Sequence, residues 1–288
     1  MLKGTHAMSS ILTNNGAMVA LQTLKVVNTN LTDTQNAIST GKEIGVAKDN
    51  AAVWAISKTM ESDIASFEAI EEGLSMGEAT VAVASAGAEQ IVEKLVEIKE
   101  LIVSAQAENV SHDKIQTDIE SKIDQIESII GAAQFNGANL LANTIDGTAT
   151  QMGVLASLDR VGAGGTVTGV DITIEAQGFE STLDLANSLT AITDTATAAS
   201  ALGEIEDFLQ VAISGAAELG AAAARIDDQA SFVSKLVDSM TMGVSTMTDT
   251  DMEEASARLS ALQTQQELAV QSLGIANQAP QALLQLFN

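Results

Sequence analysis

Apolar residues recur with a seven-residue period near both ends of the chain. In the N-terminal stretch, over residues 9–40, the members of this series are Ala17, Leu24, Leu31 and Ile38. In the C-terminal stretch, from about residue 248 onward, two interleaved positions of a heptad form the seam, occupied by Leu259, Leu262, Ala269 and Leu273. Such spacing predicts helices that pack along one narrow seam. Because both seams include small and polar residues, neither helix should be stable alone, and the simplest arrangement pairs the two. We expect these eight residues to serve the packing of the terminal helices and of neighbouring subunits.

Longer helices are predicted inward of these two stretches. After a turn over residues 42–50, helix is expected over residues 51–108 and again over residues 111–131, where isoleucines recur every three or four positions. A further Ala-rich helical stretch is expected over residues 181–247. The chain contains a single proline, which favours long uninterrupted helices.

The centre of the chain and the start of the last helix carry different local signals. Residues 131–180 are punctuated by glycines, and residues 166–174 alternate between apolar and polar side chains as a half-buried strand does. We therefore expect a small β-hairpin segment in this region. At the start of the last helix, Thr250 and Glu253 have the spacing of a capping box.

These elements predict a mainly α fold, an elongated antiparallel helical bundle or coiled coil built from both termini, with a small central β-hairpin segment. We expect a terminal coiled-coil domain, a helical core domain, a short β-rich segment, and an extension or tag at the N-terminus. The terminal coiled-coil domain is expected over residues 8–45 and 248–288, and the helical core domain over residues 46–144 and 181–247. The β-rich segment is expected over residues 145–180, and the extension or tag over residues 1–7.

The charge balance limits the partners that the chain can bind. It has 38 acidic and 13 basic residues and a net charge of −25, which argues against binding nucleic acid or an anionic membrane surface. No apolar run reaches the ~18 residues of a membrane span, and the first 30 residues lack the apolar core of a signal peptide. The mean hydropathy is nonetheless +0.20. We therefore expect apolar helix faces to be buried between subunits, and the acidic excess of residues 146–228 to lie on an outer face.

Residues suited to catalysis or metal binding are scarce. The chain has two histidines and no cysteine, and it lacks the phosphate-binding and zinc-binding motifs. Asp249, Asp251 and Glu253 do not have the spacing of a calcium loop. The sequence therefore predicts a protein that is not an enzyme and that holds no metal or cofactor.

Several short motifs, taken together, resemble one known family. They are the run Ser9–Leu24, Ile38-Ser-Thr-Gly41, Ala47–Ala52, Gln134-Phe-Asn-Gly137 with Leu140-Leu141, Leu273–Gln278, and Leu283–Phe287. In their order and spacing these motifs resemble those of bacterial flagellins, most closely the alphaproteobacterial type with a short variable region. The resemblance covers roughly residues 8–145 and 225–288.

The resemblance implies a structural subunit that polymerises into the flagellar filament and serves swimming motility. Such a subunit is extracellular and leaves the cell without a cleaved signal peptide. Its implied partners are further copies of itself, the flagellar export apparatus, an export chaperone, and cap and junction proteins, with no nucleic acid and no membrane insertion. Two alternatives remain: a hook–filament junction protein, which would stop at rings, and a coiled-coil adaptor, which would have a purely helical centre.

The resemblance also indicates a candidate site for escape from immune detection. Flagellins that activate the innate flagellin receptor carry an Arg-rich stretch on a core helix, and the corresponding stretch here is Leu95-Val-Glu-Ile-Lys-Glu-Leu101. Glu97 reverses the charge at one Arg position, Lys99 lacks the planar guanidinium at the other, and Val96 removes an amide. We expect these three residues to weaken receptor binding. The alternative is neutral drift on a polar helix face.

Overall fold

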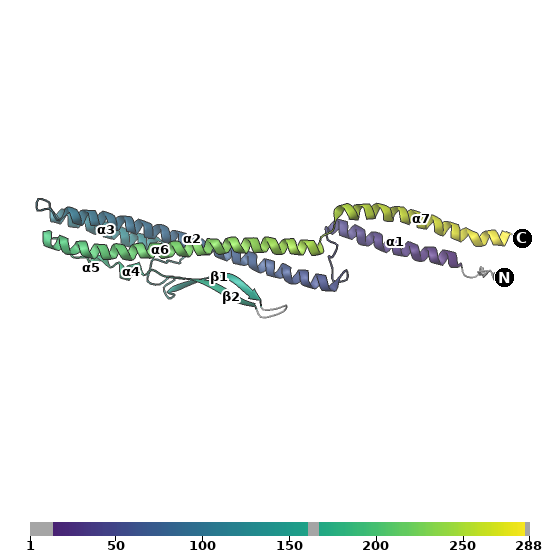
Figure 1. The fold of residues 1–288 in the computed structure, drawn as a ribbon, viewed down its shortest axis with the longest axis horizontal. Helices are drawn as coiled ribbons and strands as arrows, with labels where there is room; N and C mark the ends of the chain where they lie inside the picture. Colours follow the sequence, from purple (N-terminus) through teal and green to yellow (C-terminus); the bar gives the residue numbers. More distant parts are fainter. Residues whose placement is uncertain (1–13, 161–166, 286–288) are drawn as a thin grey trace, which may run out of the picture. The chain divides into compact units, whose positions relative to one another are not determined.

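The computed structural model describes residues 14–160 and 167–285 and shows a mainly helical chain with one two-stranded antiparallel sheet (Figure 1). The predicted fold class is therefore confirmed. The elements, in chain order, are α1 (Asn15–Thr40), α2 (Ala51–Ser104), α3 (His112–Ala132), β1 (Gln151–Arg160), β2 (Val167–Glu175), α4 (Phe179–Thr182), α5 (Leu185–Ser188), α6 (Thr195–Thr248) and α7 (Met252–Gln285).

The chain divides into two compact units. Unit 1 comprises Met1–Ser62 and Met240–Asn288, and unit 2 comprises Asp63–Ser239. Both limits fall inside helices, α2 and α6, whereas the predicted domain bounds follow helix ends, so those bounds stay predictions. The expected extension of residues 1–7 lies outside the described residues.

Unit 1 is built around an antiparallel pair of helices, α1 and α7, which lie side by side (Figure 1). Three hydrogen bonds fix their register. The Asn14 side-chain amide donates to the Ala276 carbonyl oxygen (2.6 Å), the Gln266 amide donates to Asn28 Oδ1 (2.7 Å), and the Thr250 N–H donates to the Gly41 carbonyl oxygen (2.9 Å). These bonds join the start of α1 to the C-terminal part of α7 and the end of α1 to the start of α7, as an antiparallel pair requires.

The ends of α1 follow from local sequence signals. Asn14 caps the start of the helix, because its Oδ1 accepts a hydrogen bond from the Ala17 N–H at 3.0 Å. Gly41 ends the helix in the left-handed region, with φ 71°, as a glycine at this position is able to do without strain. The N-terminal stretch therefore ends at residue 40, where the sequence predicted its end.

The predicted capping box at the start of α7 is wrong. Asp251 is the cap: its Oδ1 accepts hydrogen bonds from the N–H groups of Glu253 (2.9 Å) and Glu254 (3.3 Å). Thr250 cannot serve, because its backbone N–H is held by Gly41 and its hydroxyl is buried without a hydrogen-bond partner. Pairing with α1 therefore moves the cap one residue along the chain.

This assignment predicts different effects on stability for two neighbouring substitutions. Asp251→Ala should lower the free energy of unfolding of unit 1 by about 0.5–2 kcal/mol, because two helix N–H groups lose their acceptor. Thr250→Val keeps the side-chain shape and removes an unpaired buried hydroxyl, so it should be neutral or slightly stabilising. Denaturant unfolding followed by circular dichroism measures both. If Thr250→Val lowered the free energy of unfolding more than Asp251→Ala does, the result would support the capping box of Thr250 and Glu253.

Unit 2 contains three long helical segments whose buried residues repeat every three and four positions. Two ion pairs connect the segments: Lys122 of α3 with Glu97 of α2, and Lys99 of α2 with Glu206 of α6. The Gln116 side chain of α3 also accepts a hydrogen bond from the N–H of Ile192, in the loop before α6, at 2.8 Å. The buried apolar series of α2 includes Phe67, Ile70, Leu74, Val81, Ala84, Ala88, Ile91, Leu95, Ile98 and Ile102. That of α6 includes Ala198, Ala201, Ile205, Leu209, Ala212, Leu219, Ala222, Ile226 and Val233.

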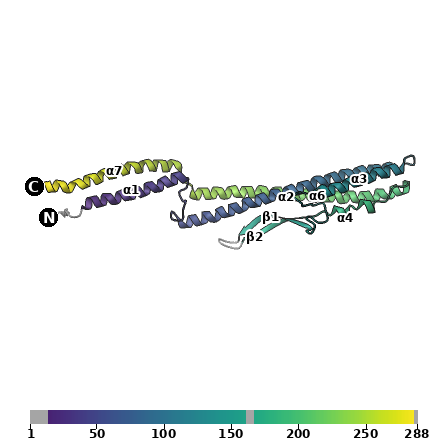
Figure 2. The same ribbon diagram turned by 180° about the vertical axis from the view of Figure 1, so that it is seen from behind.

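The central hairpin has one buried face that packs against these helices (Figure 2). β1 and β2 pair antiparallel, with a bulge at Ala156. The freed Ala156 carbonyl oxygen accepts a hydrogen bond from the Gln229 amide of α6 at 2.8 Å, and Val154 lies directly against Gly77 of α2. The strand expected over residues 166–174 is thus confirmed as β2 to within one residue.

Two predicted helices were too long. Helix α2 ends at Ser104 rather than near residue 108, and the His112 Nε2 lies 2.9 Å from the Ala105 carbonyl oxygen, which satisfies a group at the helix end. The stretch expected to be helical from residue 181 instead contains the end of α4, the short helix α5 and a loop over residues 189–194, and α6 begins only at Thr195. Its apolar side chains, among them Leu183, Leu185 and Ile192, are buried one by one rather than along a single helical face.

Candidate assembly surface

The predicted terminal seam residues all lie on the facing sides of α1 and α7. Ala17, Leu24, Leu31 and Ile38 are half-buried, and between them lie the buried side chains of Ala20, Val27 and Thr34. On α7, Leu262 and Ala269 are buried, while Leu259 and Leu273 are half-buried. These contacts form within one chain. Any role of the seam residues between subunits stays a prediction.

A second group of apolar residues on unit 1 points away from the seam. We call it the outer apolar surface, and each of its members is more than half exposed: Met18, Val19, Leu21 and Val26 of α1, with Leu268, Val270 and Ile275 of α7. The heptad analysis missed these residues because it followed only the seam positions. The signal that could have found them is the run of apolar side chains at positions between the seam residues. A surface of this kind typically marks an interaction site.

Charge is divided unequally between the two units. Unit 2 contains 29 acidic and seven basic residues, whereas unit 1 contains nine acidic and six basic residues. The acidic excess is therefore spread over the whole of unit 2 and is not confined to residues 146–228. Because unit 1 is nearly neutral, identical copies can approach there with little electrostatic repulsion.

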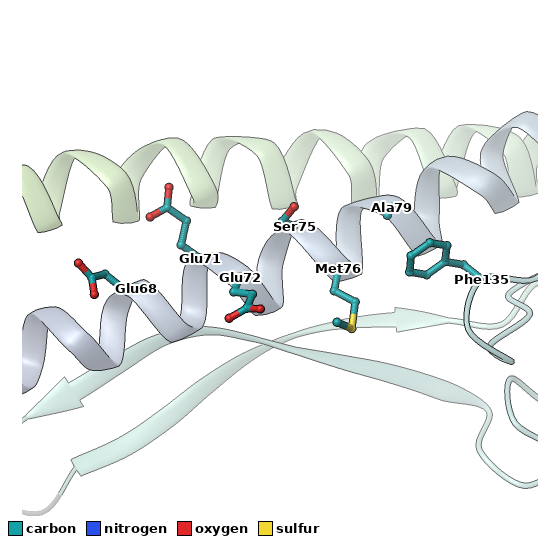
Figure 3. Close-up of a pocket in the computed structure, with 7 residues that line it drawn as sticks. All are labelled: Glu68, Glu71, Glu72, Ser75, Met76, Ala79 and Phe135. Atoms are coloured by element: carbon teal, nitrogen blue, oxygen red, sulfur yellow. The ribbon is translucent and has the colours of Figure 1, made fainter.

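A shallow groove of about 620 Å³ lies on unit 2. Figure 3 shows the side chains of Glu68, Glu71 and Glu72 along α2, with Met76 and Phe135 further along the groove. The described residues contain no group of three His, Asp or Glu side chains able to hold a metal ion. Nor is any helix in residues 14–160 and 167–285 apolar and long enough to cross a bilayer.

The three candidate receptor residues differ in their surroundings. The Val96 side chain is exposed. Glu97 forms ion pairs with Lys94 (2.6 Å) and with Lys122 of α3, and Lys99 forms an ion pair with Glu206 of α6. Hydrogen bonds from Lys122 and then from Lys94 hold the pKa of the Glu97 carboxyl below its ordinary value. The sequence analysis missed these pairs because the partners of Glu97 and Lys99 on α3 and α6 are distant in sequence. Both residues thus link helices within the chain.

Comparison with known proteins identifies the family. Residues 11–146 match the bacterial flagellin N-terminal helical region, and residues 202–287 match the bacterial flagellin C-terminal helical region. A flagellin of Brucella melitensis is 41% identical over 286 residues, covering 97% of this chain and 99% of the relative. Flagellin FljM of Caulobacter vibrioides is 37% identical over 284 residues, covering 98% and 99%. The chain belongs to the bacterial flagellin family.

The relatives of this flagellin are alphaproteobacterial, as the sequence motifs predicted. The Brucella and Caulobacter relatives named above match it over nearly their whole length, so those two share its short central region. A solved structure described as a flagellar hook-associated protein of Vibrio parahaemolyticus covers 68% of this chain and all of that one, with a TM-score of 0.50 and 14% identity. At that identity the likeness shows the helical fold alone, and it does not favour the junction-protein alternative.

Proposed function

We propose that this flagellin polymerises into the flagellar filament through the outer apolar surface of unit 1, while the acidic unit 2 faces solvent. The observation that carries the proposal is the contrast between the units. Both units expose apolar side chains, but those of the outer apolar surface lie on the nearly neutral unit 1, whereas unit 2 carries 29 of the 38 acidic residues. Exposed apolar area favours association, and like charges oppose it, so association is favoured at unit 1.

Electron microscopy of the purified protein, after short filament seeds are added, tests this function. Long helical filaments are expected. Rings would instead support a hook–filament junction protein, and particles of a few subunits would support a coiled-coil adaptor. The β-hairpin of unit 2 already speaks against an adaptor of purely helical type.

Export and partners are part of the same proposal. A filament subunit must reach the cell exterior, and we infer that this one passes unfolded through the flagellar export apparatus, aided by an export chaperone and received by cap and junction proteins. The absence of cysteine supports this route, since no thiols can cross-link in transit. Secretion that continues after the flagellar export apparatus is deleted would contradict it.

Salt should accelerate seeded polymerisation. Added salt shortens the screening length to ~10 Å at 0.1 M, which reduces the repulsion between neighbouring copies of a −25 chain. Light scattering over a salt series measures the rate. As a matched comparison, the triple variant Glu68→Gln, Glu71→Gln, Glu72→Gln should polymerise faster at low salt and depend less on salt. Rates that fall steadily as salt is added would place paired acidic residues in the subunit interfaces instead.

We also propose that Val96, Glu97 and Lys99 reduce activation of the innate flagellin receptor. Wild-type monomers should be nearly silent in a reporter-cell assay, and Glu97→Arg with Lys99→Arg should raise the signal. Hydrogen bonds to charged groups contribute about 1.5–3 kcal/mol each, so a gain of roughly tenfold or more is expected.

The reporter-cell assay needs a control for the loss of the two ion pairs that Glu97 forms. Glu97→Arg places a third cation beside Lys94 and Lys122, so the helical content of the double variant must first be shown to match wild type. Glu97→Gln removes the same two pairs without supplying a guanidinium, and it should stay silent. Strong signalling by the wild-type monomer would refute the proposal. Silence from every variant would assign the escape to other positions.

A further inference from the structure

Methionine thioethers are the only side-chain sulfur groups in this chain, which has ten methionines and no cysteine. Among the described methionines, Met18 of α1 and Met242 of α6 are the most exposed, each at 63%. Both belong to unit 1. A thioether within reach of solvent can be oxidised to the sulfoxide, which turns a flexible apolar side chain into a polar one.

The two equally exposed methionines have different surroundings. Met18 belongs to the outer apolar surface, where Val19 is its neighbour in the chain and Leu21 lies on the same side of the helix, three positions on. The residues three and four positions from Met242 are polar: Asp238, Ser239, Ser245 and Thr246. At the same spacing from Met18, Leu21 is apolar and the other three residues are polar, so Met18 has one apolar neighbour on its helix face, besides Val19 next to it in the chain, and Met242 has none.

We propose that Met18 is an oxidation-sensitive assembly site, at which the patch of Met18, Val19 and Leu21 packs against a second copy of the chain and sulfoxidation prevents that packing. The inference rests on the proposed filament function and deepens it by naming one contact and its chemical control. A second copy is the favoured occupant because the patch lies on the nearly neutral unit, where identical chains repel each other least.

The chemistry requires only a peroxide. The Met18 sulfur attacks one oxygen of hydrogen peroxide, the O–O bond breaks, and a sulfur–oxygen bond forms while water leaves. The sulfur is oxidised by two electrons and the peroxide is reduced by two. The new S=O dipole must then lose its hydration before a neighbouring apolar surface can cover it, so association becomes less favourable.

The proposal predicts how access to the sulfur changes with assembly. In the free subunit, Met18 and Met242 should be oxidised at similar rates, because their exposed fractions are equal. In the filament, the second copy covers Met18, so its oxidation should slow strongly relative to the same residue in the free subunit. Oxidation therefore acts on subunits before assembly more than on finished filaments.

The test treats full-length monomers of wild type, Met18→Leu and Met242→Leu with hydrogen peroxide, removes the peroxide, and follows seeded polymerisation by sedimentation and electron microscopy. Mass spectrometry of peptides records the gain of one oxygen at each methionine. Leucine keeps the apolar volume and cannot form a sulfoxide, and Met242→Leu is the matched control of equal exposure. We expect oxidised wild type and Met242→Leu to lose most of their sedimenting filaments, and oxidised Met18→Leu to retain them.

Several outcomes would overturn the proposal. One is unchanged polymerisation of wild type whose Met18 is fully oxidised, and another is an equal loss in oxidised Met18→Leu. Oxidation of Met18 in filaments as fast as in monomers would exclude the contact itself. If untreated wild type formed no filaments, the proposed function would fail, and that result is distinguishable because it appears before any peroxide is added.

Discussion

Removal of residues 259–288 should abolish polymerisation while unit 2 stays folded. The deletion takes away the C-terminal half of the seam that buries Ala20, Val27 and Thr34 of α1, together with the exposed Leu268, Val270 and Ile275. Left without its partner, α1 cannot bury its apolar stripe and should fray. Unit 2, Asp63–Ser239, has its own buried core and should keep its helical circular dichroism signal. Sedimentation and electron microscopy measure the loss of filaments.

A pair of point variants separates loss of the seam from loss of chain length. Leu262 is 7% exposed and belongs to the seam, whereas the next residue, Gln263, is exposed. Leu262→Ala should destabilise the α1–α7 pair by about 2–5 kcal/mol, which is more than a two-helix contact of small residues tolerates. Gln263→Ala should change stability by less than about 0.5 kcal/mol and should polymerise normally. Normal filaments from the truncated chain would refute the role of the pair.

The heptad pattern was enough to predict the seam because the pattern and the burial depend on the same few helical positions. The predicted residues Leu24 and Leu262 lie on the seam, and the stop at Gly41 needed only its backbone freedom. The hairpin was also predictable, since the alternation of β2 matches one buried face. In each case a local signal and the tertiary partner favour the same structure.

Other features depended on contacts between residues that are far apart in the sequence, which a local sequence pattern does not predict. The cap of α7 moved to Asp251 because Gly41, more than 200 positions away, holds the Thr250 backbone. The ion pairs of Glu97 and Lys99 have the same origin. The outer apolar surface was missed for another reason: its side chains are more than half exposed, and a search for one buried helix face does not select exposed positions.

One glycine on a long helix of unit 2 is required by packing, which the sequence pattern does not reveal. Gly215 lies in the buried series of α6, and Phe179 of α4 packs directly on it. A Cβ added there would lie 2.6 Å from Phe179 Cζ and 2.8 Å from Gln177 Oε1. Phe179 is only 1% exposed, so its ring has little room to move. The glycine is therefore required by the close approach of α4 and not by its backbone angle.

Gly215→Ala should accordingly lower the free energy of unfolding of unit 2 by about 1–3 kcal/mol, since overpacking a filled core forces the ring or the backbone to shift. Gly220, on the same helix, is the matched control: a Cβ there would meet nothing within 4 Å. Gly220→Ala should stabilise the helix by about 0.5–1 kcal/mol, because alanine loses less backbone entropy on folding. Urea unfolding of the two variants should give changes of opposite sign. If both stabilised the protein, Phe179 would not pack on Gly215, and the position of α4 on α6 would have to be revised.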